Sequence, residues 1–361
     1  MSEMPGPHDP RAWHLDSSEG DETLSEAPKV HKESIVIDAH CDTLQALTGR
    51  GIQGFPGIGS GTRDFFKRND SGHIDLPRLR EGGVTCQVMA VYIGPQYKPA
   101  RSARRALELL DAFYSLLDQS EDLRLATKAS DIEKAKRDGA VSALLSIEGG
   151  EAIEGSLALL RDFYRLGVRA MGLTWNQRND IADGQGEKSA GSGLTDFGIS
   201  VVKEMERLGM LVDVSHLSDS SFWAVDRVAE RPYIASHSNC RALASASRNL
   251  TDPMIEAIAK KGGVIGVAFP GDFVDDDPSK VSLSRLCDHI EHIRSVAGID
   301  HVGLGSDFDG FGVRPGSGIV MKDVSELPSL TVELLRRGYT DEEIKKVLGG
   351  NWLRVYSEVL G

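Results

Sequence analysis

Eight short runs of β-branched and apolar residues recur along the chain, and amphipathic stretches with helical spacing lie between several of them. The runs are at 34–40, 85–93, 141–148, 168–175, 211–216, 232–237, 263–269 and 301–307, and the clearest helical stretches are at 103–119, 155–167 and 196–209. The last two stretches end on glycine, as helices often do. Strands that alternate with helices predict parallel strands joined by crossover helices. We therefore expect an α/β fold, a TIM-type (β/α)8 barrel, with a doubly wound open sheet as the alternative.

The pattern predicts one barrel domain over residues 34–361, preceded by an arm at 1–33. The arm is rich in Pro, Ser and acidic residues, which favours a flexible or surface-draped segment, and we expect its histidines (His8, His14 and His31) to be solvated. It lacks a basic start followed by an apolar stretch, so no secretory signal is expected. The connection from Leu44 to Thr85 is long, and its glycine-rich part at 51–66 has the composition of an active-site loop without a phosphate-binding motif.

Charge and cysteine content narrow the class of partner and the compartment. The net charge of −13 argues against nucleic acid or an anionic membrane as a partner, and no apolar run reaches the length of a membrane span. The four cysteines (Cys41, Cys86, Cys240 and Cys287) form no CxxC pair, so we expect reduced thiols and a cytoplasmic protein.

Ionisable residues close five of the eight apolar runs, where a plain strand would stay apolar. In a parallel barrel the carboxyl ends of the strands form one rim, so side chains from distant positions meet there. The residues in question are three histidines and three carboxylates: His40, Asp42, Glu148, His216, His237 and Asp307. Buried ionisable groups are costly unless they are paired or bind a metal, and mixed imidazole and carboxylate ligands favour zinc. Six ligands exceed the need of one catalytic zinc, so we expect two Zn²⁺ per chain.

Other nucleophiles are disfavoured by the sequence. There is no GxSxG motif, and no cysteine has an evident histidine partner. Cys41 lies between His40 and Asp42, so we expect its side chain to point away from whatever those two share. A metal-activated water is the nucleophile that remains.

Several segments resemble the renal (membrane) dipeptidase family of the amidohydrolase superfamily, in the order found in that family. They are "DAHCDT", "GHIDLPRLREGGVTCQVMAVY", "SIEGG", "LVDVSH", "ASHSNCRAL" followed by "SRN", and "HVGLGSDFDG", spread from about residue 34 to the C-terminus. The resemblance implies a TIM-like barrel with a binuclear zinc site. It also implies cleavage of dipeptides, often with a D-residue at the C-terminal position, and a homodimer.

The resemblance also implies a role for each matching residue. His40 and Asp42 would bind the first metal, His216 and His237 the second, and Glu148 would bridge them. Asp307 would contact the first metal and carry the proton from the water to the leaving amine. Arg248 would hold the terminal carboxylate of the substrate.

One position departs from the family. Animal members have a histidine after "LT" at the end of the fourth strand, credited with polarising the scissile carbonyl, and here Trp175 stands there. Trp175 and Asn176 are our candidates for further substrate contacts, with Arg178 and Asn179 as alternatives to Asn176.

Two other function classes stay open at this point. One is another metal-dependent hydrolase on the same scaffold, such as an amidase, a deaminase or a lactonase. The other is a non-catalytic protein that holds metal. His73 and Asp309 are left open as pocket residues, whereas His289 and His292 lie in a helical stretch and are interpreted as packing or surface residues.

Overall fold

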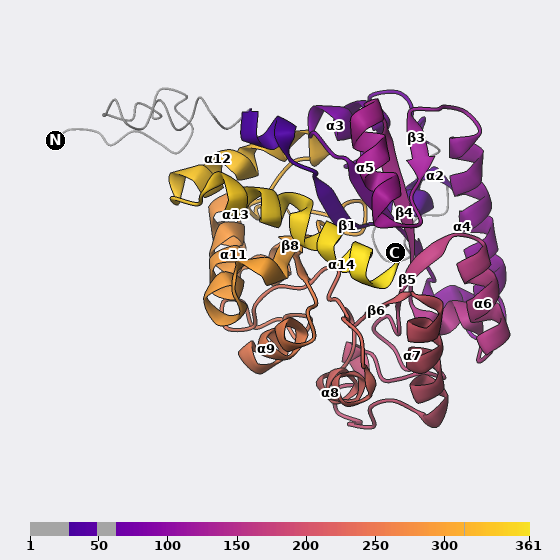
Figure 1. Ribbon diagram of the computed structural model, residues 1–361. Helices are drawn as coiled ribbons and strands as arrows, with labels where there is room; N and C mark the ends of the chain where they lie inside the picture. Colours follow the sequence, from indigo (N-terminus) through magenta and orange to yellow (C-terminus); the bar gives the residue numbers. More distant parts are fainter. Residues whose placement is uncertain (1–28, 49–62, 314) are drawn as a thin grey trace, which may run out of the picture.

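The parallel strands curl into a TIM-type α/β barrel (Figure 1). The computed structural model describes residues 29–48, 63–313 and 315–361. Neighbouring strands follow the order β6-β5-β4-β2-β1-β8-β7, and β3 pairs with β4. The strands are β1 (Ile37–Cys41), β2 (Cys86–Tyr92), β3 (Leu123–Leu125), β4 (Val141–Glu148), β5 (Val168–Gly172), β6 (Leu211–Asp213), β7 (Ile265–Val267) and β8 (Val302–Leu304).

Two isolated parallel bridges close the barrel between β6 and β7. Ile234 pairs with Asp213, and Ala235 pairs with Ile265. The strand expected at 232–237 is therefore reduced to two residues. Its ladder ends at Ser236, because the amide and the hydroxyl of Ser236 both donate to the Asp213 carboxylate instead.

The sequence pattern did not predict strand β3. It is three residues long, too short to show an alternating pattern, and it pairs with the first part of β4 at Leu123 and Val141. Since β5 pairs with the second part of β4, the two short strands share one side of it.

Helices cover the outside of the barrel, and the three expected from the sequence are present as α4, α6 and α7. Gly209 ends α7 with φ of 74°, a left-handed conformation that glycine adopts without strain. The described helices are α2 (Thr43–Leu47), α3 (Leu76–Glu81), α4 (Ser102–Leu117), α5 (Ala129–Asp138), α6 (Leu157–Arg165), α7 (Asp196–Leu208), α8 (Asp219–Val228), α9 (Asp252–Lys260), α10 (Gly271–Val274), α11 (Leu283–Ala297), α12 (Pro328–Arg336), α13 (Asp341–Lys345) and α14 (Asn351–Val359).

The end of the expected arm is packed on the barrel. Residues 29–33 are helical, and His31 is buried between Thr331 of α12 and the carbonyl of Gly82, with bonds of 2.7 and 2.9 Å. The expectation that His31 is solvated is therefore wrong, because both ring nitrogens have partners in the folded domain. His8, His14 and residues 51–62 of the expected active-site loop lie outside the described residues.

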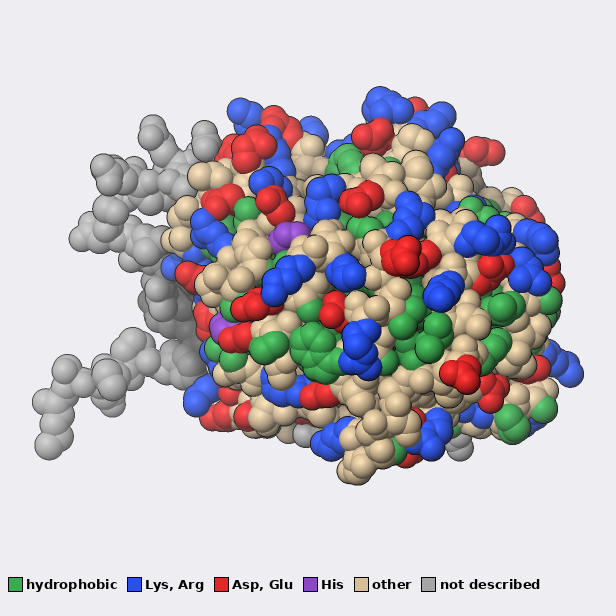
Figure 2. Space-filling view, turned by 60° about the horizontal axis from the view of Figure 1, so that its bottom comes forward, with side chains coloured by type: hydrophobic (Ala, Val, Ile, Leu, Met, Phe, Trp, Pro, Cys, Tyr) green, Lys and Arg blue, Asp and Glu red, His purple; other side chains and the backbone are tan. Residues whose placement is uncertain are grey.

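The surface and the helices add two general observations. In Figure 2 acidic and basic side chains are interspersed over one face, so the excess of acidic residues forms no single patch there. None of the helices in the described ranges is both long and apolar enough to cross a membrane.

The C-terminal helix α14 packs against residues near the beginnings of the barrel strands, and Figure 1 shows it lying across the barrel. Its Trp352, Val355 and Tyr356 share one apolar cluster with residues such as Ile37 and Leu211. The indole nitrogen of Trp352 donates to the carbonyl of Leu304 at 3.0 Å. This end of the barrel is thus filled by apolar contacts, and the other end carries the ionisable residues.

We predict that Trp352→Ala lowers the free energy of unfolding by about 3–5 kcal/mol, because it removes a fully buried indole that the surroundings cannot replace. Leu107→Ala is the control, since Leu107 is 49% exposed and its removal should cost about 0.5 kcal/mol or less. Urea denaturation followed by circular dichroism measures both. Equal losses in the two variants would contradict the packing role of α14.

Candidate active site

Six side chains that close barrel strands meet at one end of the barrel. His40 and Asp42 come from the end of β1, and Glu148 is the last residue of β4. His216 and Asp307 each lie three residues beyond the end of a strand, and His237 follows the bridge at Ala235. The side chain of Asp307 is 14% exposed and the other five residues are buried. The structure thus brings together all six residues expected from the sequence.

The backbone is specialised where it presents these groups. His216 has φ of 68° and Asp307 has φ of 64°, in the left-handed region that non-glycine residues seldom occupy. The register of β1 against β2 shifts between Asp38 and Cys41, directly at His40. Such local strain is often found at functional sites, where it sets the direction of a side chain.

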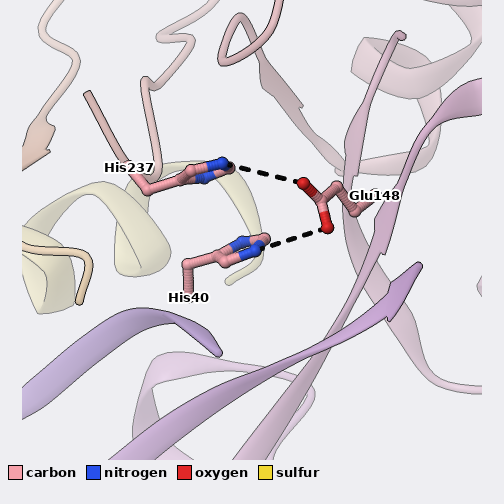
Figure 3. A group of neighbouring side chains, drawn as sticks. All are labelled: His40, Glu148 and His237. Carbon is pink, nitrogen blue, oxygen red and sulfur yellow. Dashed lines mark ion pairs between the residues drawn. The ribbon is translucent and has the colours of Figure 1, made fainter. Parts of the chain in front are cut away.

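Glu148 stands between two groups of possible ligands. His40 Nε2 lies 3.5 Å from one carboxylate oxygen of Glu148, and His237 Nε2 lies 3.7 Å from the other. Figure 3 shows both imidazoles directed at this carboxylate. The two rings stack with their centroids 3.8 Å apart. His216 Nε2 lies 2.9 Å from the same oxygen as His237. Each oxygen of Glu148 thus faces a different histidine group, as a bridging ligand would.

The first group is completed by two more carboxylates. His40 Nε2 lies 3.6 Å from Asp42 and 3.9 Å from Asp307. A Cβ atom on Gly310 would lie 2.3 Å from oxygens of both aspartates, so a side chain at 310 would push these carboxylates from their present positions. The Asp42 carboxylate also accepts a hydrogen bond of 3.0 Å from the side-chain nitrogen of Gln45.

The hydrogen bonds of the second group fix the protonation of its rings. His216 Nδ1 faces the Asn176 side-chain oxygen at 2.8 Å, so this nitrogen carries the proton. His237 Nδ1 lies 2.7 Å from Ser236 Oγ, whose own proton goes to the Asp213 carboxylate. Both Nε2 atoms therefore carry a lone pair, although they lie only 2.9 Å apart. A cation between them would turn this repulsion into attraction.

His40 supplies the other sign that the residues fit a metal. Both of its ring nitrogens are buried, and neither has a hydrogen-bond partner among the described residues. Buried polar atoms without partners are uncommon, and they need an explanation such as a bound ion. Imidazole and carboxylate donors at this spacing fit divalent metals such as zinc.

The pKa shifts of the histidines also differ between the group of His216 and His237 and the group around His40. Burial, helped by the Arg248 cation, lowers the pKa of His216 to about 3, and burial likewise lowers the pKa of His237. Burial alone would lower the pKa of His40, but the Glu148 and Asp42 carboxylates raise it well above its usual value. Burial and the neighbouring carboxylates raise the pKa of Asp307.

Four of these six residues, Asp42, Glu148, His216 and Asp307, line a cavity of about 670 Å³. The loops after β7 and β8 supply an apolar wall, which includes Phe269, Phe273 and Phe311. Arg248, Trp175 and Asn176 also line the cavity, as expected from the sequence. A volume of this size admits a small ligand.

Arg248 is a buried cation that contacts no opposite charge within residues 29–48, 63–313 and 315–361. Its guanidinium donates to the carbonyl of His237 at 3.0 Å and to the Ser238 hydroxyl at 3.4 Å, and it lies over the Phe273 ring. It forms no ion pair with a carboxylate of the described residues, and its Nε atom has no hydrogen-bond partner there. A buried guanidinium in this state is suited to an anionic group of a ligand.

The residues around Trp175 have different roles. Trp175 packs against Tyr92 and His216, with ring centroids 5.2 and 5.9 Å apart. Asn176 orients His216, a role that the sequence did not indicate. Arg178 pairs with Asp183.

Asn179 is occupied within its own loop, where it bonds to the carbonyl of Leu173 and to the amide of Ile181. Neither Arg178 nor Asn179 lines the cavity.

Asp309 and His73, left open above, lie behind the cavity wall. Asp309 accepts hydrogen bonds from Arg63, from Thr43 at 2.8 Å and from the amide of His73 at 2.7 Å. This network ties the segment after β1 to the turn that carries Asp307.

His289 and the four cysteines are all buried in the folded domain. His289 is a packing residue, as expected, because it is fully buried and its ring bonds to Cys240 and Val274. All four cysteines are free and buried, and Cys41 packs in the apolar core.

A parallel α/β barrel with imidazoles and carboxylates gathered at its strand ends is an arrangement that suits a metal-dependent hydrolase. The chain belongs to the membrane dipeptidase family, peptidase family M19, whose model matches residues 24–360. The family and its metallopeptidase members support a metal-dependent dipeptidase.

Three solved structures are similar to this chain over most of its length. Dipeptidase AC, a metallopeptidase of family M19, has 29% identity and a TM-score of 0.79, covering 91% of this chain and 100% of its own. A metallopeptidase from Rhodobacter sphaeroides, bound to a phosphinate mimic of the dipeptide L-Ala-D-Ala, has 28% identity and a TM-score of 0.76, with the same coverage. The probable dipeptidase PvdM from Pseudomonas aeruginosa has 23% identity and a TM-score of 0.82, covering 94% of this chain and 99% of its own, and supports the fold alone.

We predict that Ser236→Ala weakens metal binding by about 10- to 100-fold, because the link from Asp213 to His237 is lost and the ring is free to turn. Ser142→Ala is the matched control, since it removes another buried serine hydroxyl, bonded to the Thr85 carbonyl far from the ligand group. Competition with a chromogenic zinc chelator measures both affinities. Equal affinities in the two variants would show that the Asp213–Ser236 link does not support the metal ligands.

Proposed function

We propose that this protein is a binuclear zinc dipeptidase that hydrolyses the peptide bond of free dipeptides, including those with a D-residue at the C-terminal position. The observation that carries the proposal is the buried guanidinium of Arg248, unpaired among the described residues, in the wall of a cavity that four of the six candidate ligands also line. An enzyme for internal bonds of long peptides has no use for such a charge. The dipeptide mimic bound to the Rhodobacter sphaeroides enzyme supports the L,D part of the proposal.

Two ions are proposed because the ligands divide into two sets. His40, Asp42 and Asp307 would hold one ion, His216 and His237 the other, and Glu148 would contact both. When bound, the ions would lower the pKa of a water molecule and polarise the peptide carbonyl. Zinc is the proposed metal because half of the ligands are imidazoles.

Each of the residues around the cavity would then have its own role in binding or proton transfer. Arg248 would hold the terminal carboxylate of the dipeptide in a bidentate pair and so set the position of the scissile bond. Asp307 would take the proton from the attacking water and return it to the leaving nitrogen. Trp175 and Asn176 would border the substrate, with Asn176 also holding His216.

Homodimer formation, a cytoplasmic location and a single domain over 34–361 stay predictions. They rest on the resemblance, on the reduced cysteines and on the uninterrupted barrel pattern.

We predict that the wild-type enzyme strongly prefers a free dipeptide to its C-terminal amide and to a tripeptide, and that Arg248→Ala loses most of this preference. Losing the charged partner of a buried cation costs about 2–5 kcal/mol, or about 30- to several-thousand-fold in kcat/KM. Steady-state kinetics on the three substrates measures the preference.

Arg178→Ala is the control for loss of a positive charge on a neighbouring loop, because Arg178 is half exposed and paired with Asp183. This control should keep the preference of the wild type. Equal cleavage of all three substrates by the wild type would contradict the carboxylate clamp and the dipeptidase proposal with it.

A further inference from the structure

We propose that the hydroxyl of Tyr92 donates a hydrogen bond to the oxygen of the scissile carbonyl as that carbon becomes tetrahedral, which makes Tyr92 a further catalytic residue. The inference rests on the proposed dipeptidase function, and it concerns a residue that the strand-end pattern of ionisable groups did not single out.

The strand places Tyr92 in the same layer as Glu148. Tyr92 is the last residue of β2, and the register of the parallel pair sets it directly beside Glu148, the last residue of β4. Partners in register project to the same side of a sheet, so both side chains enter the barrel mouth. Tyr92 lines the cavity and is only 3% exposed. The phenol therefore borders the place where the carbonyl carbon would be attacked.

The hydroxyl of Tyr92 lacks a partner in the part of the chain that the structure describes. It is buried and makes no hydrogen bond to any of the described residues. The hydroxyls of Tyr114 and Tyr233, in contrast, bond to the carbonyl of Leu166 and to Asp226. An unsatisfied buried hydroxyl is destabilising and is expected to persist where a ligand completes it.

The surroundings hold the Tyr92 ring in place and leave its hydroxyl able to donate. A tyrosine phenol is protonated at neutral pH, so the Tyr92 hydroxyl can donate a hydrogen bond. The Trp175 ring packs edge-on against the Tyr92 ring, at 5.2 Å and 70°, and limits its rotation. A preorganised neutral donor in a water-poor cavity is the kind of group that stabilises a developing oxyanion.

The position of Arg248 identifies which substrate oxygen lies near Tyr92. Around the barrel β2 is the second strand and the bridge at 234–235 is the sixth, so Tyr92 and the loop of Arg248 face each other across the mouth. A dipeptide with its carboxylate at Arg248 would extend its N-terminal half toward Tyr92. That half offers a carbonyl oxygen, which accepts hydrogen bonds, and an ammonium group, for which the nearby carboxylates are the better partners.

The proposed step balances without further reactants. The oxygen of the attacking water forms a bond to the carbonyl carbon, and the π electron pair moves onto the carbonyl oxygen. The Tyr92 hydroxyl donates a hydrogen bond to this oxygen and keeps its proton. The pair then reforms the C=O bond as the C–N bond breaks, and the nitrogen takes the proton that Asp307 received from the water.

The test is Tyr92→Phe in the metal-loaded enzyme. Loss of one such donor should lower kcat by about 10²-fold, with KM changed by less than about threefold, and should weaken a phosphinate dipeptide analogue by a factor similar to the loss of kcat/KM. The melting temperature should equal or exceed that of the wild type, because the variant removes an unsatisfied hydroxyl. A merely structural role for Tyr92 predicts a lower melting temperature and no separate loss of phosphinate affinity.

Tyr339→Phe is the matched control. The Tyr339 hydroxyl is also buried without a partner among the described residues, but its ring lies against Arg294, away from the cavity. This variant should keep kcat, KM and phosphinate affinity within about twofold of the wild type.

A substrate without the amino group separates the two ends of the dipeptide. If the hydroxyl acts on the carbonyl oxygen, Tyr92→Phe lowers kcat equally for the dipeptide and for its desamino analogue. An effect confined to KM of the dipeptide would place the hydroxyl on the ammonium group and overturn the inference, as would an unchanged kcat. A wild type without any activity on dipeptides would instead overturn the proposed function.

Discussion

The structure depends on one electrostatic constraint, which is the convergence of three imidazoles and three carboxylates at a single buried place. Two lone pairs face each other at 2.9 Å between His216 and His237, and three carboxylates surround His40. The pair of divalent cations that we propose would satisfy both sets at once. The left-handed residues at the strand ends, the absence of a side chain at Gly310 and the supporting bonds of Asn176, Ser236 and Gln45 all serve this convergence.

The barrel separates stability from chemistry along the direction of its strands. The strand beginnings pack with α14 in an apolar cluster that contains none of the six candidate ligands. The strand ends carry strained backbone and unsatisfied polar atoms, among them His40 Nε2, Arg248 Nε and the Tyr92 hydroxyl. The destabilisation at one end is offset by packing at the other. This division explains how a single domain holds so many ionisable groups in one cavity.

Much of this arrangement could be predicted from the sequence, because ionisable residues that close apolar runs are visible without a structure. His40, Glu148, His237 and the other three candidate ligands were found in that way, and Arg248 through the resemblance. What could not be predicted depends on distant contacts. A serine at 236 gives no sign that it links Asp213 to a ligand, and a tyrosine at the end of a strand does not show that its hydroxyl lacks a partner. His31 is buried only because α12, about 300 residues later in the chain, returns to it. The short β3 has no periodicity to detect.

The central claim is that the ligand group holds two metal ions on either side of Glu148. Anomalous X-ray scattering at the zinc edge, from crystals of protein loaded with zinc, tests it most directly. The account predicts two peaks about 3.5–4 Å apart, one contacted by His40, Asp42 and Asp307 and the other by His216 and His237, each with one oxygen of Glu148. A single peak at full occupancy in fully active protein, or two peaks of which one lies outside these six residues, would contradict it.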